Sequence, residues 1–390
     1  MAHLMNNYAR QAVAFTHGEG CRLFDAHGRR YLDGLAGIAV NTLGHNHPRL
    51  TAALERQVHR LIHTSNLYQV REQEALADRL ALLSGMDEAF FCNSGCEANE
   101  AAIKLARLYG HKKGIENPAI IVMEQAFHGR TLATLSATGN RKVQAGFEPL
   151  VPGFVRVPFD DLGAIEQVAA NNANVVAVLF EPVQGEGGIN ICHDEFMRGL
   201  RRICAAKGWL LMVDEVQCGI GRTGQWFAYQ HAEIRPDVMT LAKGLGSGVP
   251  VGACLTAGPA TGVFKPGNHG STFGGNPLAC VAALTTLAVL EEDNLLPRAA
   301  VLGERIRARF AEQLAGQAGV VDIRGSGLMI GIELDRPCAA VVGAGLEAGI
   351  LINVTVEKVI RLLPPLVMSD AEADELVDGV VTLVRRFLAG

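Results

Sequence analysis

The sequence predicts an α/β protein, with a mostly parallel sheet covered by helices on both faces and a smaller domain built from both chain ends. Its 390 residues are 49% hydrophobic and 19% charged, which is ordinary for a packed chain of two or three domains. Between about residues 50 and 265, apolar β-branched runs alternate with amphipathic helical patterns, and the pattern changes on either side. We therefore expect a large domain over residues 50–270 and a small α+β domain from residues 1–49 and 271–390.

The central region supplies the strands and helices of the large domain. The apolar runs are AIIVM (119–123), NVVAVLFEP (174–182), WLLMVDEV (209–216), VMTLAK (238–243) and ACLTA (253–257), and helical patterns include 97–110 and 194–207. Strands that are apolar throughout are buried on both faces, as they are in parallel sheets between two layers of helices. The alternation therefore favours a parallel sheet over a sandwich or barrel.

The two flanks predict the elements of the small domain. The segment GCRLFDAHGRRYLDG, residues 20–34, is typical of a short hairpin with HGRR at its turn. After residue 275, two long helical patterns precede the strand-like segments 321–335 and 350–365. Since no repeat or low-complexity linker is visible, we expect the two domains to pack closely.

Charge and cysteine usage limit the classes of function. The net charge is −5, from 35 basic and 40 acidic residues, and no basic run is visible that would bind nucleic acid or an anionic membrane. The N-terminus lacks the features of a signal peptide, and the longest apolar helical pattern, 277–290, is too short for a bilayer. Nine cysteines without a C-x-x-C pair are interpreted as reduced, buried side chains, so a cytoplasmic location is expected. No metal site is expected, because His45 and His47 lack further ligands nearby in the sequence.

The stretch VDEVQCGIGRTG, residues 213–224, contains the G-x-G-x-x-G spacing of a dinucleotide-binding loop. In a dinucleotide fold the first glycine follows the strand directly, the last opens a helix, and an acid lies about 20 residues further on. Here polar residues separate the strand from the first glycine, the aromatic segment QWFAY follows the last one, and Asp237 is not at that spacing. A nicotinamide site is therefore disfavoured.

Two strand ends carry residues that suit a different cofactor. Asp214 and Glu215 end an apolar strand, where open α/β sheets place ligand groups, and a protonated ring nitrogen would supply the partner that a buried carboxylate there needs. Lys243 ends another apolar run and precedes three closely spaced glycines that would leave room for a bulky group. A lysine in apolar surroundings can attack a carbonyl and form a Schiff base. The alternative is a surface lysine, which is the commoner situation.

The segment FCNSGCEANEAAIKLARLYG, residues 91–110, predicts a capped helix from about Glu97, with Asn93 or Ser94 as N-cap. The free N–H groups of Gly95 and Cys96 could then bind an anion such as phosphate, although an ordinary capped helix explains this stretch equally well. A phosphate cradle, a strand-end carboxylate and a reactive lysine are the groups that pyridoxal phosphate requires.

Seven motifs spread over nearly the whole chain carry a resemblance to a known family. They are SGCEANE, FHGRT, EPVQGEGG, LMVDEVQCGIGRTG, LAKGLGSGVPVGA, GSTFGGNP and RLLPPL. Together they resemble the class-III, ornithine-type aminotransferases among the fold-type-I pyridoxal-phosphate enzymes. The resemblance implies the fold of that group, with a seven-stranded, mostly parallel sheet between helices.

The resemblance also implies site residues. The cofactor-binding set is Ser94, Gly95, Cys96, Phe127, Asp214, Val216, Gln217, Lys243 and Thr272, and the substrate-binding set is Arg130, Ser271, Arg361 and Glu186. Lys243 would form the Schiff base, and Asp214 would pair with the pyridinium nitrogen. Glu186, the third catalytic residue implied, would pair with Arg361 in the resting site. Thr272 would reach the phosphate of the neighbouring subunit, so a homodimer is implied.

The segment DGLAGIAVNTLGHNHP is most similar to the branch of this family that acts on acetylated ornithine. The implied reaction moves the δ-amino group of N2-acetyl-L-ornithine to 2-oxoglutarate, giving N-acetyl-L-glutamate 5-semialdehyde and L-glutamate in arginine biosynthesis. Gly37 and Ile38 would offer an acyl group room and apolar contact where related ornithine enzymes carry a tyrosine. Succinylornithine, ornithine and 4-aminobutyrate transaminases are alternatives, as are a decarboxylase, an aminomutase and a regulator without turnover.

Overall fold

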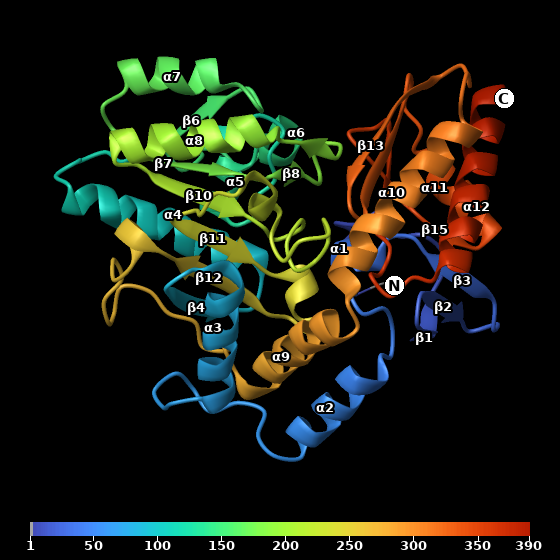
Figure 1. Ribbon diagram of the computed structural model, residues 1–390, viewed down its shortest axis with the longest axis horizontal. Helices are drawn as coiled ribbons and strands as arrows, with labels where there is room; N and C mark the ends of the chain where they lie inside the picture. The colour runs from blue at the N-terminus through green and yellow to red at the C-terminus, as the bar shows by residue number, and fades with distance from the viewer. Residues whose placement is uncertain (1–2) are drawn as a thin grey trace.

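The computed structural model describes residues 3–390 and builds the chain around one seven-stranded sheet and two four-stranded sheets. The large sheet lies in the left part of Figure 1, and the two smaller sheets lie in the right part together with both chain ends. The predicted α/β class with a mostly parallel seven-stranded sheet is confirmed.

The large sheet has the strand order β4-β12-β11-β10-β7-β5-β6. Its strands are β4 (Glu88–Cys92), β5 (Ala119–Met123), β6 (Phe154–Val157), β7 (Val175–Phe180), β10 (Leu210–Asp214), β11 (Val238–Leu241) and β12 (Gly252–Thr256). Strand β12 runs antiparallel to both of its neighbours, and the pairs from β11 to β6 are parallel. All the predicted apolar runs form strands of this sheet, and β4 and β6 complete it at its two edges.

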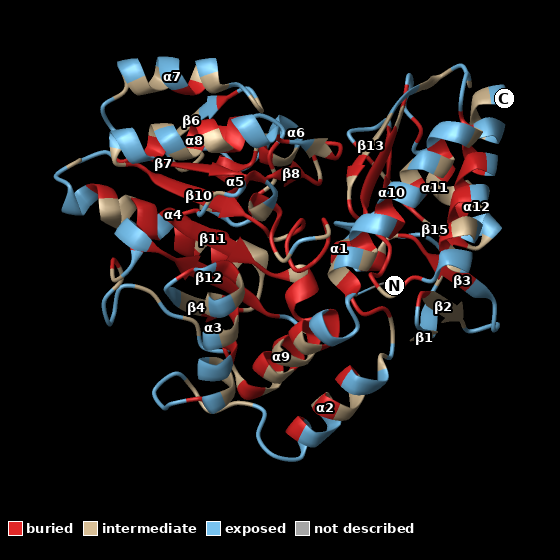
Figure 2. Cartoon of the chain, viewed as in Figure 1, coloured by how far each residue is buried: buried red, intermediate tan, exposed pale blue. Residues whose placement is uncertain are grey.

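Helices cover both faces of the large sheet, as Figure 1 shows. Helix α4 (Gly95–Lys112) covers one face, and α7 (Leu162–Asn171) with α8 (Asp194–Lys207) covers the other. Successive residues of each strand serve opposite faces, so that Met212 packs towards α4 and Val213 packs towards α8. The five inner strands of the sheet are accordingly buried along their whole length (Figure 2). Helix α4 begins at Gly95 and not at the predicted Glu97.

Helix α9 (Pro277–Glu292) packs against α2 (Pro48–Val58) and α3 (Arg71–Ser84), and α10 (Leu295–Gln313) follows it. Helices α9 and α10 confirm the two long helical patterns predicted after residue 275. The Asn276 side chain caps α9 by accepting a hydrogen bond from the N–H of Ala279 at 2.9 Å, and Pro277 occupies the first turn.

The predicted hairpin and the C-terminal strands form the two smaller sheets. The first contains β1 (Phe15–Glu19), β2 (Arg22–Asp25), β3 (Arg30–Asp33) and β15 (Ile350–Leu351), and the second contains β13 (Val320–Ser326), β14 (Met329–Leu334), β17 (Val359–Leu362) and β16 (Asn353–Thr355). Because β15 pairs in parallel with β3, the two ends of the chain share one sheet. A division into domains at residues 50 and 270 stays a prediction.

The remaining elements are short or belong to the C-terminal layer. They are α1 (Ala36–Ala39), α5 (Leu132–Ala137), α6 (Arg141–Gln144), α11 (Ala340–Ala348), α12 (Asp370–Ala389), β8 (Val183–Gln184), β9 (Asn190–Ile191) and the 3-10 turns η1 (Ala228–Ala232), η2 (Lys243–Leu245) and η3 (Gly258–Ala260). Across residues 3–390, no helix combines the length and the apolar character needed to cross a membrane. All nine cysteines are free, and each is buried except the half-buried Cys96. The described residues gather no three His, Cys, Asp or Glu side chains as a metal site.

Candidate active site

A cavity of about 390 Å³ opens where β7, β10 and β11 end and α4 begins. Open α/β sheets bind ligands at this edge. The predicted residues that line the cavity are Ser94, Gly95, Cys96, Phe127, Arg130, Asp214, Val216, Gln217 and Lys243. The structure therefore brings together residues spread between positions 94 and 243, including the lysine, the carboxylate and the helix N-terminus that were singled out from the sequence.

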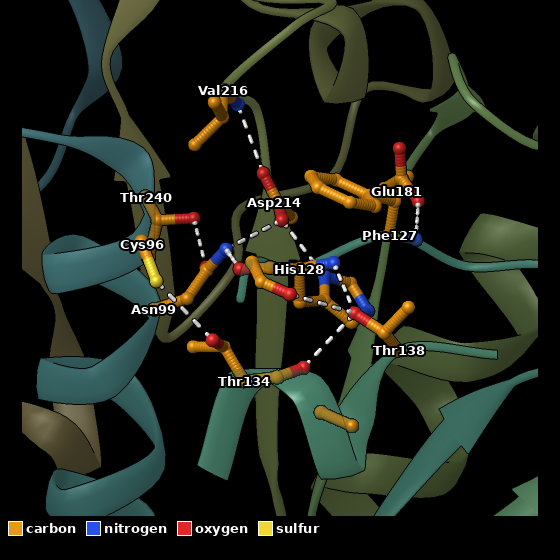
Figure 3. Close-up of polar contacts among 12 residues, drawn as sticks. Cys96, Asn99, Phe127, His128, Thr134, Thr138, Glu181, Asp214, Val216 and Thr240 are labelled. Carbon is orange, nitrogen blue, oxygen red and sulfur yellow. Dashed lines mark hydrogen bonds and ion pairs between the residues drawn. The ribbon is translucent and has the colours of Figure 1, made fainter. Parts of the chain in front are cut away.

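Asp214 is the buried acceptor at the centre of the site, as Figure 3 shows. Its Oδ2 accepts a hydrogen bond from Nδ2 of Asn99 at 2.7 Å and lies 2.8 Å from Nδ1 of His128. Its Oδ1 accepts a hydrogen bond from the N–H of Val216 at 3.0 Å. The Thr240 hydroxyl donates to Oδ1 of Asn99 at 2.7 Å, so the Asn99 amide must direct its NH₂ group at Asp214. Three nitrogen groups from separate segments therefore hold the Asp214 side chain in one orientation.

His128 was not predicted, although it stands between Phe127 and Arg130 in the FHGRT motif. Its side chain is buried, and Nδ1 contacts Asp214 while Nε2 has no hydrogen-bond partner among residues 3–390. The backbone N–H of His128 donates to the Thr138 hydroxyl at 3.0 Å, which fixes the start of this segment. His128 therefore helps to orient Asp214.

Lys243 follows β11 with a left-handed backbone angle, φ 40°, a conformation that side-chain-bearing residues seldom adopt. Burial lowers the pKa of its amine, and nearby Glu186 and Arg361 act in opposite directions. A lowered pKa increases the neutral, nucleophilic fraction of the amine.

Two of the three glycines after Lys243 are required by the packing of their own loop and do not face the cavity. A Cβ on Gly246 would lie 2.0 Å from the carbonyl oxygen of Val249, and one on Gly244 would lie 2.5 Å from the Thr42 hydroxyl. Only Gly248 of the three lines the cavity. The prediction that all three make room for a bulky group is therefore corrected.

The N-terminus of α4 forms one wall of the cavity. The Ser94 hydroxyl accepts a hydrogen bond from the N–H of Glu97 at 3.2 Å, so Ser94 is the N-cap. The N–H groups of Gly95 and Cys96 are then in the first turn, where no intrahelical acceptor exists. A Cβ on Gly95 would lie 2.6 Å from Cγ1 of Val216, so only glycine lets the start of α4 pack this closely against Val216.

A second cavity, of about 600 Å³, adjoins the first, because Phe127 and Arg130 line both. Glu186 lines this cavity, and its Oε1 lies 2.7 Å from Nη1 of Arg361. Arg361 is fully buried and also donates to Oε1 of Gln217 at 3.3 Å. Burial alone would raise the pKa of Glu186, but Arg361, Lys243 and Gln217 together outweigh it, and the pKa is lowered.

Two buried glutamates lie at strand ends: Glu181 was not predicted as a site residue, and Glu215 was expected beside Asp214 but does not line the cavity. Glu181 follows β7, lines the first cavity and accepts a hydrogen bond from the N–H of Phe127 at 2.8 Å. Glu215 follows Asp214 but turns away from the cavity, and it accepts hydrogen bonds from the N–H groups of Ala228 and Tyr229, both at 2.9 Å. Asp214 and Glu181 therefore face the cavity, whereas Glu215 holds the start of η1.

Arg361 lines neither cavity, and four other predicted residues also lie outside the set that lines them. The Ser271 hydroxyl accepts from the N–H of Gly274 at 3.0 Å, and Thr272 is exposed on the same loop. Gly37 and Ile38 belong to a run of left-handed residues in α1, and the half-buried Ile38 packs against a core cluster. The residue of that loop that reaches the first cavity is Val40.

The GIGRTG segment that resembled a dinucleotide loop has a structural role. Arg222 is buried within it and donates to the carbonyl oxygens of Leu328, at 3.2 Å, and Pro364. Gly224 has φ 92°, and a Cβ there would lie 2.7 Å from that of Ala300. The glycines therefore let this loop pack against α10 and the C-terminal strands.

Known proteins share the sequence pattern and the fold of this chain. The family described as Aminotransferase class-III matches residues 4–384. An acetylornithine aminotransferase of Nitrosomonas europaea is 61% identical over 388 residues, which cover 100% of this chain and 99% of that protein. The acetylornithine aminotransferase structure from Elizabethkingia anophelis has a TM-score of 0.88 at 34% identity, covering 98% and 96% of the two chains. An ornithine aminotransferase structure from Toxoplasma gondii, with pyridoxal phosphate at partial occupancy in its active site, has a TM-score of 0.94 at 37% identity, covering 99% and 92%.

Proposed function

The chain belongs to the class-III aminotransferases, and from this premise we propose that it transfers the δ-amino group of N2-acetyl-L-ornithine to 2-oxoglutarate. The products are N-acetyl-L-glutamate 5-semialdehyde and L-glutamate, as in arginine biosynthesis. The observation that carries the proposal is that one cavity holds Lys243, Asp214 and the N-terminus of α4, with Arg130 at its side. Full-length relatives named for this activity support the choice of substrate.

Pyridoxal phosphate is the cofactor of this family, and the donor set of the cavity fits it. The N–H groups of Gly95 and Cys96 would hold the phosphate, and the absent Cβ of Gly95 keeps the cradle open. Asp214, held in place by Asn99, would pair with the ring nitrogen, and Phe127 would pack on the ring. When bound, the cofactor supplies an aldehyde that condenses with amines and a ring that withdraws electrons from the substrate carbon.

The protein's own groups perform the remaining tasks. Lys243 has a lowered pKa, so its neutral amine could accept a proton from the substrate carbon that carries the amino group and deliver it to the carbon of the cofactor's aldehyde group. Asp214 favours a positive charge opposite its carboxylate, and Asn99 and His128 keep that carboxylate in place. Gln217 lies between this region and Arg361, to which its Oε1 is hydrogen-bonded.

Two arginines would bind substrate carboxylates in turn. Arg130 lines both cavities and lies over the Phe127 ring, with 5.7 Å from its guanidinium carbon to the ring centroid. Arg361 is neutralised by Glu186, whose side chain lines the second cavity. We propose that Glu186 stays on Arg361 while the acetylated donor is bound and gives way to the α-carboxylate of glutamate or 2-oxoglutarate.

The surroundings of the first cavity favour an acylated donor over free ornithine. Val40 supplies apolar contact from the loop that includes Gly37 and Ile38, and no hydroxyl on those three residues could hold a charged α-ammonium. An ammonium that loses water there without a partner would incur a free-energy penalty of several kcal/mol at worst. Succinylornithine remains a second candidate donor, since its acyl group is longer but chemically similar.

The test compares kcat/KM for N-acetylornithine, succinylornithine, ornithine and 4-aminobutyrate at fixed 2-oxoglutarate. The acetylated donor should give the highest value, with one glutamate formed per donor consumed. A higher value for ornithine or 4-aminobutyrate would sink the substrate proposal and leave transamination intact. Loss of donor without glutamate would instead indicate a decarboxylase or aminomutase.

The role of Lys243 can be tested by borohydride reduction of the purified protein followed by peptide mapping. The cofactor should be trapped on Lys243, and Lys243→Ala should lose both the adduct and nearly all turnover. Lys104 is a suitable comparison, because it is exposed and contacts His269 at 2.9 Å. An adduct on any lysine other than Lys243 would contradict the assignment.

We also propose that the protein works as a homodimer in the cytoplasm. Thr272 is exposed beside the exposed ring of Phe273, in keeping with a residue that reaches a neighbouring subunit. Nine free thiols suit a reducing compartment. Sedimentation analysis should give twice the mass of the 41.5 kDa chain.

A further inference from the structure

Glu181 joins two separate segments of the active site through one buried carboxylate. It follows β7 and is 5% exposed. Its Oε1 accepts a hydrogen bond from the N–H of Phe127 at 2.8 Å, as Figure 3 shows, and its Oε2 accepts one from the N–H of Gly185 at 3.3 Å. A carboxylate that accepts two backbone N–H groups fixes both segments relative to the strand that carries it.

Each of the two segments carries a functional group. The first begins with Phe127 and continues through His128 to Arg130. The second contains Gly185, directly before Glu186, which pairs with Arg361. Gly185 is also confined, because a Cβ there would lie 2.1 Å from Oε1 of Gln217. The position of Glu186 on Arg361 therefore depends on a loop whose start is hydrogen-bonded to Glu181.

We propose that Glu181 is a positioning residue that holds Glu186 on Arg361, and that a proton on Glu181 releases Gly185 and frees Arg361 for a substrate carboxylate. The proposal rests on the proposed function and adds a pH-sensitive control to it. A protonated carboxyl keeps only part of its acceptor capacity, and the longer bond to Gly185 is the one that is lost first. Arg361 itself stays in place, because its strand β17 and its hydrogen bond to Asn353 at 3.2 Å do not involve Glu181.

The electrostatic surroundings make the titration accessible near neutral pH. Burial raises the pKa of Glu181 to about 7, while His128 lowers it and Asp214 raises it. Lys243 and the Cys192 thiol also face Glu181. Because the pKa of Lys243 is also shifted, a pH profile has to be compared with a variant in which Glu181 no longer titrates.

The test uses Glu181→Gln, with Glu215→Gln as a matched control. The amide of E181Q can accept from Phe127 but presents its NH₂ group to the N–H of Gly185, as the protonated acid would. Glu215 is also a buried strand-end glutamate that accepts two backbone N–H bonds, and burial raises its pKa to about 7 as well. Its donors belong to η1, so E215Q makes the same chemical change away from Glu186.

In the cofactor-loaded wild-type enzyme, KM for 2-oxoglutarate should be lower at pH 6 than at pH 8.5, by about fivefold, the effect of one lost hydrogen bond. E181Q should show the low value at both pH values, and E215Q should retain the wild-type pH dependence. Non-specific damage to the site would raise KM, so the direction of the change separates positioning from disruption.

Calorimetry with glutarate, an unreactive dicarboxylate, gives a second readout that needs no turnover. E181Q should bind glutarate about fivefold more tightly than wild type at pH 8.5, and the two should agree at pH 6. Equal or weaker binding by E181Q, or an equal effect of E215Q, would overturn the inference. Absence of transamination in the wild type would sink the proposed function instead, while the glutarate titration would still decide the role of Glu181.

Discussion

At Asp214, three donors from different parts of the chain converge on one side chain. Asn99 belongs to α4, His128 to the segment before α5, and Val216 to the turn after β10. The sequence predicted Asp214 from its place at the end of an apolar strand. It could not predict its partners, because Asn99 and His128 are 115 and 86 residues away and neither belongs to a local pattern that indicates the contact.

This geometry predicts the effect of Asp214→Asn. The new NH₂ group would face donors on Asn99, His128 or Val216, and the charge opposite the ring nitrogen would be lost. Turnover should fall by a factor on the order of 10²–10³, and stability should fall by roughly 1–3 kcal/mol for the unsatisfied buried donor. Steady-state kinetics and denaturant unfolding measure the two effects.

Thr240→Val supplies the comparison for this variant. It removes only the hydrogen bond to Oδ1 of Asn99 and keeps the carboxylate. A smaller loss of turnover than in D214N is therefore expected. Equal losses in the two variants would mean that the hydrogen-bond network matters more than the charge of Asp214.

At the scale of elements, the start of α4 depends on a neighbour that is far away in the sequence. The SGCEANE motif predicted a capped helix and an anion site, and the structure places Ser94 as its N-cap. The reason for glycine at position 95 was not evident from the motif, because the contact that excludes a side chain comes from Val216. The proposed phosphate cradle therefore depends on the packing of α4 against the turn after β10.

Gly95→Ala should weaken cofactor binding. Its Cβ would lie 2.6 Å from Cγ1 of Val216, so the first turn of α4 has to shift away from the phosphate position. Titration of the apoprotein with pyridoxal phosphate should show a dissociation constant about tenfold higher, the equivalent of roughly 1.4 kcal/mol. The double variant with Val216→Ala removes the colliding methyl groups and should recover most of the affinity. No recovery in the double variant would show that the clash is not the cause.

Strand β17 and the loop after β8 supply the two halves of the Glu186–Arg361 pair. Arg361→Ala should therefore damage the glutamate half-reaction more than the acetylornithine half-reaction, on the order of a hundredfold for a lost buried charge partner. Single-turnover spectra measured with each amino donor separate the two halves. Arg130→Ala is the counterpart and should affect the acetylated donor strongly. Equal loss of both half-reactions in R361A would remove the proposed exchange of carboxylates.

For the whole molecule, uniformly apolar strands were predictable and short, partly exposed ones were not. Strands β5, β7 and β10 are buried along their length, so their sequences are continuous apolar runs. Strands β4 and β6 lie at the edges of the sheet and keep exposed residues, which weakens the pattern. The pairing of β3 with β15 joins both chain ends, and no local sequence pattern encodes so distant a contact.

The role of Arg222 was not predicted, because its hydrogen-bond partners are also far away in the sequence. Its motif resembles a glycine-rich ligand loop, but its guanidinium is buried against the carbonyl oxygens of Leu328 and Pro364. These acceptors lie in the C-terminal part of the chain, beside the sheet of β13, β14, β16 and β17. A glycine spacing taken alone therefore indicates a tight loop and does not identify what packs against it.

Two buried glutamates should make the stability of the apoprotein fall as pH rises from about 4.5 to about 7. Burial raises the pKa of Glu181 and Glu215 from 4.5 to about 7. Between these values the unfolded chain has released both protons while the folded chain retains them, so the free energy of unfolding decreases with pH. Each group contributes up to about 1.4 kcal/mol per pH unit. Surface acids with a lowered pKa, such as Asp374 and Glu333, act in the opposite direction but only at lower pH.

Denaturant unfolding of the apoprotein at pH 5, 6, 7 and 8 measures this dependence. The free energy of unfolding should be lower at pH 7 than at pH 5, and Glu215→Gln should remove about half of the slope, because one of the two titrating groups is gone. His47 and His269, whose pKa burial lowers, oppose the trend in part, and His193, whose pKa is raised by Asp160, adds to it. These histidines are present in both proteins, so the difference between wild type and E215Q isolates the glutamate. A slope that is unchanged in E215Q would mean that Glu215 ionises in the folded protein at an ordinary pH, and that its two backbone donors fully offset its burial.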